Sequence, residues 1–138
     1  MLASVYTHSI DSKTRLAIPA KYREELGDKF FITKSPRDKC LIVYSKEGWD
    51  EYVAPLEKMT RSEKEAVTRF LHKNGVQAEP DAQGRVLLGD NLVKHAQIVK
   101  NAVIIGCGKY AEIWAEEIYN ETEENIDDII GILEKYGL

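Results

Sequence analysis

The sequence predicts an α+β fold with two tandem, pseudo-symmetric β modules, a helical linker between them and a C-terminal helix. Three observations predict it: a length of 138 residues, an internal repeat, and short apolar strands that alternate with brief amphipathic helices. A chain of this length can bury a core, whereas half of it would be marginal alone. We expect modules over residues 5–47 and 76–119, the linker over 48–75, and an acidic helix over 120–138.

The repeat is clearest in a five-residue motif. Asp11-Ser12-Lys13-Thr14-Arg15 aligns with Asp81-Ala82-Gln83-Gly84-Arg85, so both copies share the pattern Asp-x-x-x-Arg. Apolar and aromatic residues also match beyond the motif, as Val43-Tyr44 does with Ile113-Trp114. Because chance five-residue matches seldom extend into matching flanks, the chain contains two copies of one module.

Both copies predict the same order of strands. A strand enriched in β-branched and aromatic residues leads into the motif, which has turn chemistry, and a short apolar strand follows. The turn signal is stronger in the second copy, where Asp81 and Gly84 suit a tight reversal. The expected strands are 4–10, 15–18, 30–33 and 41–44 in the first copy, and 75–80, 85–88, 102–105 and 111–114 in the second.

Short helices are expected after the second strand of each copy. In the first copy, Pro19 stands where a helix begins and Gly27 where it ends, which predicts a helix over 19–26. Its buried side chains should be Tyr22 and Leu26. The second copy has weaker signals, and its counterpart is placed at 90–95.

The linker and the tail carry further helical patterns. Ser45 is a candidate N-cap for the first linker helix, and Pro55 should break it. The sequence Thr60-Arg61-Ser62-Glu63 has the pattern of a capping box for a second helix. That helix should bury three residues on one face, and the tail helix four: Val67, Phe70 and Leu71 in the linker, and Ile126, Ile129, Ile130 and Leu133 in the tail.

Charge is distributed unevenly along the chain. The net charge is −4, yet residues 112–138 hold nine acidic residues and one basic residue. Residues 1–46 hold nine basic residues against five acidic ones, which is the sign that a phosphate-facing surface needs. A mixed, solvated surface would give the same count.

Patterns typical of enzymes, metal sites and membrane proteins are absent from the sequence. The three histidines are scattered, and Cys40 and Cys107 lack Cys-x-x-Cys spacing, so both cysteines are interpreted as small buried residues. The run Gly106-Cys107-Gly108 fits a hairpin turn better than a cofactor loop. No apolar run approaches the ~20 residues of a membrane span. We expect no catalysis, cofactor, metal or small-molecule substrate.

The repeated turn has a structural and a functional interpretation. In the first, the Asp caps its turn and pairs with the Arg as a local staple. In the second, Lys13, Thr14, Arg15, Gln83 and Arg85 contact DNA. Arginine can bind the O6 and N7 atoms of guanine, glutamine can pair with adenine, and lysine can neutralise phosphate. The two interpretations do not exclude each other.

These residues resemble the MraZ family. The resemblance rests on Asp11 to Arg15, the following residues 16–23, the second motif from Asp81 to Arg85, and the run Glu112-Ile113-Trp114. It covers nearly the whole chain. It implies two swapped-hairpin modules of the AbrB superfamily.

The same resemblance implies a function. Family members are cytoplasmic, nucleoid-associated regulators, usually repressors, that bind promoter repeats upstream of the division and cell-wall gene cluster, including their own gene. They assemble into closed homo-oligomeric rings, and an octamer is expected here. An alternative is an AbrB-type antitoxin or protein-interaction module that acts through its acidic tail.

This sequence departs from the family pattern at two places. Thr14 occupies the fourth motif position, where the family and Gly84 of the second copy have glycine. If that position requires positive φ, a β-branched residue is strained there, and either the turn changes shape or the hydroxyl contacts phosphate. The second departure is Gly89-Asp90-Asn91, which replaces the proline-led helix start expected after the second motif.

Overall fold

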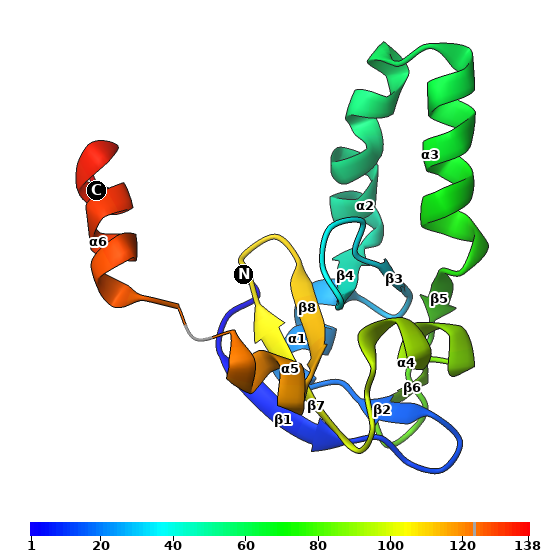
Figure 1. The fold of residues 1–138 in the computed structure, drawn as a ribbon. Helices are drawn as coiled ribbons and strands as arrows, with labels where there is room; N and C mark the ends of the chain where they lie inside the picture. The colour runs from blue at the N-terminus through cyan, green and yellow to red at the C-terminus, as the bar shows by residue number, and fades with distance from the viewer. Residues whose placement is uncertain (123) are drawn as a thin grey trace.

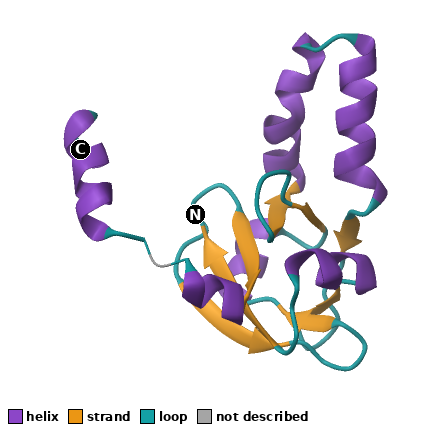
Figure 2. Ribbon diagram, viewed as in Figure 1, coloured by secondary structure: helices purple, strands orange, loops and turns teal. Residues whose placement is uncertain are grey.

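The computed structural model describes residues 1–122 and 124–138. The strands are β1 (Val5–Ser9), β2 (Arg15–Ala17), β3 (Phe30–Lys34), β4 (Leu41–Ser45), β5 (Val76–Ala78), β6 (Arg85–Leu87), β7 (Asn101–Gly106) and β8 (Ala111–Ala115). The helices are α1 (Ala20–Leu26), α2 (Lys46–Val53), the 3-10 helix η1 (Ala54–Lys58), α3 (Arg61–Lys73), α4 (Asp90–Ala96), α5 (Glu116–Glu121) and α6 (Ile126–Lys135). The predicted order of elements is confirmed in both copies (Figures 1 and 2).

The strands of the two copies are interleaved. An antiparallel sheet has the order β1-β7-β8-β4-β3-β5, and β2 pairs with β6 in a second, two-stranded sheet. The first strand of each copy therefore pairs with the third strand of the other, as β1 does with β7 and β5 with β3. Thus the fold is α+β with swapped hairpins, as predicted, and the two copies share one core.

The main core lies where the swapped hairpins meet. Leu16 on β2 is directly opposite Val86 on β6, and both side chains are fully buried. Tyr22 and Leu26 are buried on α1, as their spacing predicted. The second-copy helix α4 also forms, and it buries Leu92. Because each buried apolar side chain of this size contributes roughly 1.5–3 kcal/mol, the junction is a major source of stability.

The linker forms a helical arm. Ser45 caps α2 by accepting the Gly48 N–H, η1 replaces the α-helix near Pro55, and Thr60 with Glu63 forms the predicted capping box. The arm projects on the side of the molecule opposite the turn between β1 and β2 (Figure 1). Its packing differs from the prediction, because Phe70 is 40% exposed, whereas Leu71 is buried.

The C-terminal region differs from the predicted single helix over 120–138. The chain forms α5, which ends at Glu121, and then α6, which begins at Ile126. Residue 123 lies outside the described residues. Ile126, Ile129 and the other apolar residues of α6 are exposed, and the helix stands apart from the sheets (Figure 1). The amphipathic pattern of α6 therefore does not correspond to packing of this helix against the other described parts of the chain.

No helix in the described parts of the chain has both the length and the apolar character that crossing a membrane would require.

Candidate nucleic-acid interface

The first motif forms a turn anchored by Asp11. One carboxylate oxygen, Oδ1, accepts the backbone N–H groups of Lys13 and Arg15, both at 2.9 Å. The other, Oδ2, accepts the Nε–H of Arg15 at 2.8 Å. The backbone N–H of Asp11 donates to the carbonyl of Arg15, and the N–H of Thr14 donates to that of Asp11. The predicted staple is therefore present.

The second motif repeats this network. Asp81 Oδ1 accepts the N–H groups of Gln83 and Arg85 at 2.9 Å, and Oδ2 accepts the Nε–H of Arg85 at 3.0 Å. The N–H of Gly84 donates to the Asp81 carbonyl. The repeat in sequence thus produces the same turn twice, with an arginine held at the end of each.

The same hydrogen bonds keep both aspartates ionised. For Asp11 and Asp81, the backbone N–H of the motif arginine is the largest influence that lowers the carboxyl pKa below its ordinary 3.8. The guanidinium and the N–H of the middle residue add to this effect, while desolvation opposes it. Carboxylates that accept several N–H bonds characteristically titrate low. At neutral pH each turn therefore contains a charged Asp and Arg pair.

Pairing of β2 with β6 brings the two turns together. Leu16 and Val86 face the core, so the alternate residues Arg15 and Arg85 lie on the outer face of this small sheet. Arg85 Nη1 is 3.6 Å from Asp11 Oδ2, which links the turns electrostatically. Lys13 and Gln83 are exposed, and in the described parts of the chain their side chains make no hydrogen bond or ion pair.

Thr14 adopts a positive φ. Its φ is 60°, against 76° for Gly84. The first turn nevertheless keeps the shape of the second, and the Thr14 hydroxyl accepts the backbone N–H of Gly89 at 3.0 Å. The hydroxyl is thus directed to the start of α4.

Each turn contacts the helix start of the other copy. The carbonyl of Thr14 accepts the Leu88 N–H, and that of Gly84 accepts the Ile18 N–H. Gly89 supplies an N–H where the first copy has Pro19, which has none. The two departures from the family pattern, Thr14 and Gly89, therefore form one contact.

Gly84 also lies against the end of the Arg23 side chain. A Cβ there would lie 2.8–2.9 Å from the guanidinium of Arg23, whose Nε–H donates to the carbonyl of Ile18. In the other copy the residue 70 positions after Arg23 is Val93. Arg23 and Gly89 were not among the predicted site residues, because neither belongs to the motif. The sequence does differ between the copies at these positions, with Pro19 against Gly89 and Arg23 against Val93, and that difference could have pointed to them.

Thr14→Val is expected to lower the free energy of unfolding by about 1 kcal/mol, because it keeps the branched side chain but leaves the Gly89 N–H without its acceptor. Thr14→Ser should retain most of the stability. Thr14→Gly should cost less than Thr14→Val, since it relieves roughly 1–2 kcal/mol of left-handed strain. Urea unfolding of the three variants tests this order, and a Val variant as stable as wild type would show that the hydrogen bond contributes nothing.

Two copies that exchange hairpins, each with an Asp-anchored and Arg-bearing turn, place this protein in the AbrB-like class of swapped-hairpin folds. The family model described as an antitoxin-like MraZ protein matches residues 1–72 and, a second time, residues 70–129. The chain belongs to the MraZ family.

Curated relatives agree over nearly the full length. One from Thermoanaerobacter sp. (strain X514), named transcriptional regulator MraZ, is 45% identical over 129 residues, which is 92% of this chain and 90% of the relative. Regulators of the same name from Moorella thermoacetica and Ligilactobacillus salivarius are 41% and 38% identical. These alignments cover 98% and 94% of this chain, and 96% and 94% of the respective relatives.

Proposed function

We propose that this protein is a DNA-binding transcriptional regulator that binds double-stranded promoter DNA through its two motif turns. The observation that carries the proposal is the duplicated turn: one hydrogen-bond network, formed twice, holds an arginine on the outer face of the β2–β6 sheet. The names of the relatives support the same function. The action is stoichiometric binding, without catalysis.

The residues have different roles in this proposal. Arg15 and Arg85 contact base edges or phosphates, Lys13 contacts phosphate, and Gln83 contacts a base or the backbone. Asp11, Asp81, Gly84 and Thr14 fix the shape of the turns. The targets we propose are promoter repeats upstream of the division and cell-wall genes, including the protein's own gene. Occupation of the promoter represses transcription, and the protein acts in the cytoplasm at the nucleoid.

The charge of the turns favours an assembly of several copies. Lys13 and the two motif arginines are opposed by two aspartates, so one chain presents a single net positive charge there. Such weak contacts give useful affinity only when several act together through effective concentration. We propose a closed ring of identical chains, with eight as the expected number. The exposed apolar face of α6 supports self-association.

Light scattering on the eluting protein should therefore give a mass near eight times the 15.7 kDa of the chain. The physical reason is that two pseudo-symmetric surfaces meeting head to tail close into a ring. A truncation after Asn120 removes α6 and tests whether this helix is needed for assembly. A monomer at micromolar concentration would contradict the ring.

Binding to promoter DNA should be electrostatic despite the negative net charge. The logarithm of the association constant should fall linearly with the logarithm of salt concentration, and deletion after Asn120 should preserve or strengthen binding where the ring survives. Fluorescence anisotropy on promoter fragments from the source genome, with scrambled DNA as control, measures both effects. Salt-independent binding, or none to the protein's own promoter, would refute the proposal.

A protein-interaction module of the antitoxin type is the second candidate. The apolar residues of the acidic helix α6 are exposed, and the matching family model is described as antitoxin-like. This function predicts that the protein binds a protein partner tightly and that deletion after Asn120 abolishes this binding. It also predicts that promoter DNA is not retained in a salt-dependent way. The anisotropy experiment therefore separates the two functions.

A further inference from the structure

Two carboxylates and the Cys40 thiol meet at Glu112, and the Cys107 thiol lies against the other oxygen of the Glu112 carboxylate. Glu112 lies on β8 between Ile42 of β4 and Ile105 of β7. Cys40 stands immediately before β4, and Cys107 immediately after β7, so both reach Glu112 from neighbouring strands. The Cys40 Sγ is 3.9 Å from Glu112 Oε2, and the Cys107 Sγ is 3.8 Å from Oε1.

Asp38 completes the cluster. One oxygen of Asp38, one oxygen of Glu112 and the Sγ of Cys40 all lie within 4.8 Å of one another. Around a tetrahedral zinc ion with bonds of about 2.0–2.3 Å, ligand atoms are roughly 3.3–3.8 Å apart. The three atoms therefore need to approach by only about an ångström to hold such an ion, and water can complete the coordination.

The surrounding residues hold these ligands in place. Trp114 Nε1–H donates to Glu112 Oε1 at 3.2 Å. Ser35 is buried, its Oγ accepts the Asp38 N–H at 3.2 Å, and its own N–H donates to the Cys40 carbonyl at 3.0 Å. Partners of this kind orient metal ligands in known sites.

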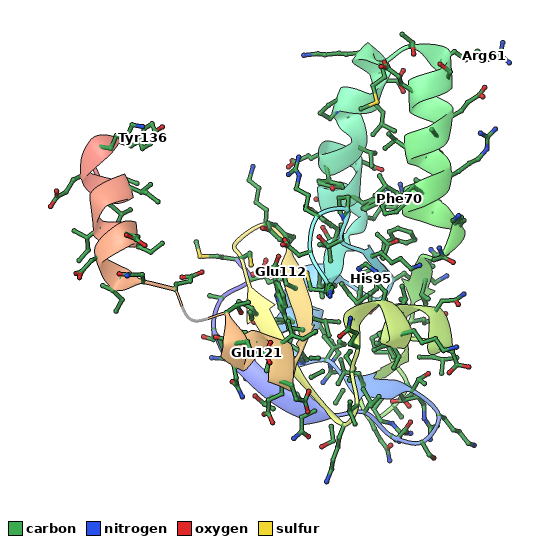
Figure 3. All side chains as sticks on the ribbon, viewed as in Figure 1. Arg61, Phe70, His95, Glu112, Glu121 and Tyr136 are labelled. Carbon is green, nitrogen blue, oxygen red and sulfur yellow. The ribbon has the colours of Figure 1, made fainter. Side chains whose placement is uncertain are left out.

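The cluster carries negative charge without a cationic side chain. Within residues 1–122 and 124–138, neither Asp38 nor Glu112 forms an ion pair with a basic residue. A cavity of about 870 Å³, lined by Asp38, Cys107 and Glu112 among others, opens over this cluster. Glu112 is labelled in Figure 3, where it lies on the sheet.

We propose that Asp38, Cys40 and Glu112 form a binding site for a thiophilic divalent cation of the zinc class. Thiolate ligands select zinc-like ions over Mg²⁺ and Ca²⁺. Cys40 binds as the thiolate, and its proton passes to solvent. Because Asp38 and Cys40 come from the first copy and Glu112 from the second, the bound ion links the two copies.

Titration of the chelator-treated, full-length protein with Co²⁺ tests the site. We expect one equivalent of Co²⁺ to bind with a thiolate-to-metal charge-transfer absorption band, Zn²⁺ to displace it, and Zn²⁺ to raise the melting temperature. Excess Mg²⁺ or Ca²⁺ should neither displace Co²⁺ nor raise the melting temperature. Cys40→Ser should abolish the band, and Glu112→Gln should weaken Co²⁺ binding at least tenfold. Glu117→Gln, which removes an exposed acidic group of neighbouring α5, is the matched control and should bind as wild type does.

Three results would overturn the site. The first is Co²⁺ binding without a thiolate band, and the second is a band that persists in Cys40→Ser. The third is a band that disappears in Cys107→Ser while Glu112→Gln binds Co²⁺ normally, because that result would assign the band to the exposed Cys107 thiol alone. Circular dichroism verifies that each variant is folded. If Cys40→Ser does not fold, Glu112→Gln decides: unchanged affinity in that variant refutes the site.

Discussion

Arg15→Ala is expected to weaken binding to promoter DNA by about 1–3 kcal/mol, or roughly 5- to 150-fold. The Nε–H of Arg15 donates to Asp11, which orients the guanidinium at the end of a turn whose next residue is buried. The fixed backbone and the held Nε leave the two Nη groups to contact DNA. A side chain held in this way loses little conformational freedom on binding, so its removal should have the largest effect of any single turn residue.

The way in which Arg15→Ala weakens DNA binding shows whether Arg15 contacts a base or a phosphate. If Arg15 reads a base, the variant should lose preference for the promoter over scrambled DNA. If it binds only phosphate, both affinities should fall equally and the salt slope should shrink by about one. Arg85→Ala should have a smaller effect, because Arg85 also lies 3.6 Å from Asp11 and has Gln83 as its neighbour instead of Lys13.

Arg61→Ala is the matched control for this experiment. It removes the same charge from an exposed position on the helical arm, far from the turns (Figure 3). Its effect on DNA binding should be small. Melting and sizing of each variant separate lost contact from lost structure. An assembled, stable Arg15→Ala protein that binds promoter DNA as tightly as wild type would remove this arginine from the interface.

The order of elements was predictable because local patterns determine it. The 70-residue offset recurs in the structure: β2 and β6, and likewise α2 and α5, begin 70 residues apart. The turn geometry was also implicit in the motif, since an aspartate followed by a residue that needs positive φ predicts the reversal. The same reasoning raised a change of turn shape at Thr14, which does not occur, because Thr14 takes a positive φ as Gly84 does.

Contacts between the copies were not predictable from such patterns. Periodicity shows which face of a strand is buried but does not name its partner, so the β1–β7 and β3–β5 pairings followed only from the resemblance. The contact between Thr14 and Gly89 spans 75 residues. Cys107 was predicted to be buried and is exposed, because the predicted hairpin turn after β7 leaves its side chain at the surface. The proposed metal ligands form no recognisable motif, because Asp38 and Cys40 lie just before β4 whereas Glu112 lies on β8, more than 70 residues later.

Leu16→Ala is expected to lower the free energy of unfolding by about 2–5 kcal/mol. Leu16 is fully buried opposite Val86, at the point where the two swapped hairpins pair. Truncation removes its apolar contacts and leaves a cavity that neighbours from both copies cannot easily fill. A domain of this kind is stable by only about 5–15 kcal/mol, so the loss is a large share of the total.

Leu87→Ala supplies the control for this substitution in the same two-stranded sheet. Leu87 is directly opposite Arg15 but its side chain is 58% exposed on the outer face, so its truncation should change stability by less than about 0.5 kcal/mol. Chemical unfolding of both variants at equal concentration measures the difference. Because Leu16 supports the strands that follow both turns, heating Leu16→Ala should abolish DNA binding at the temperature at which the core melts. If that variant instead loses DNA binding well below its melting temperature, the turns are held by something other than this core contact.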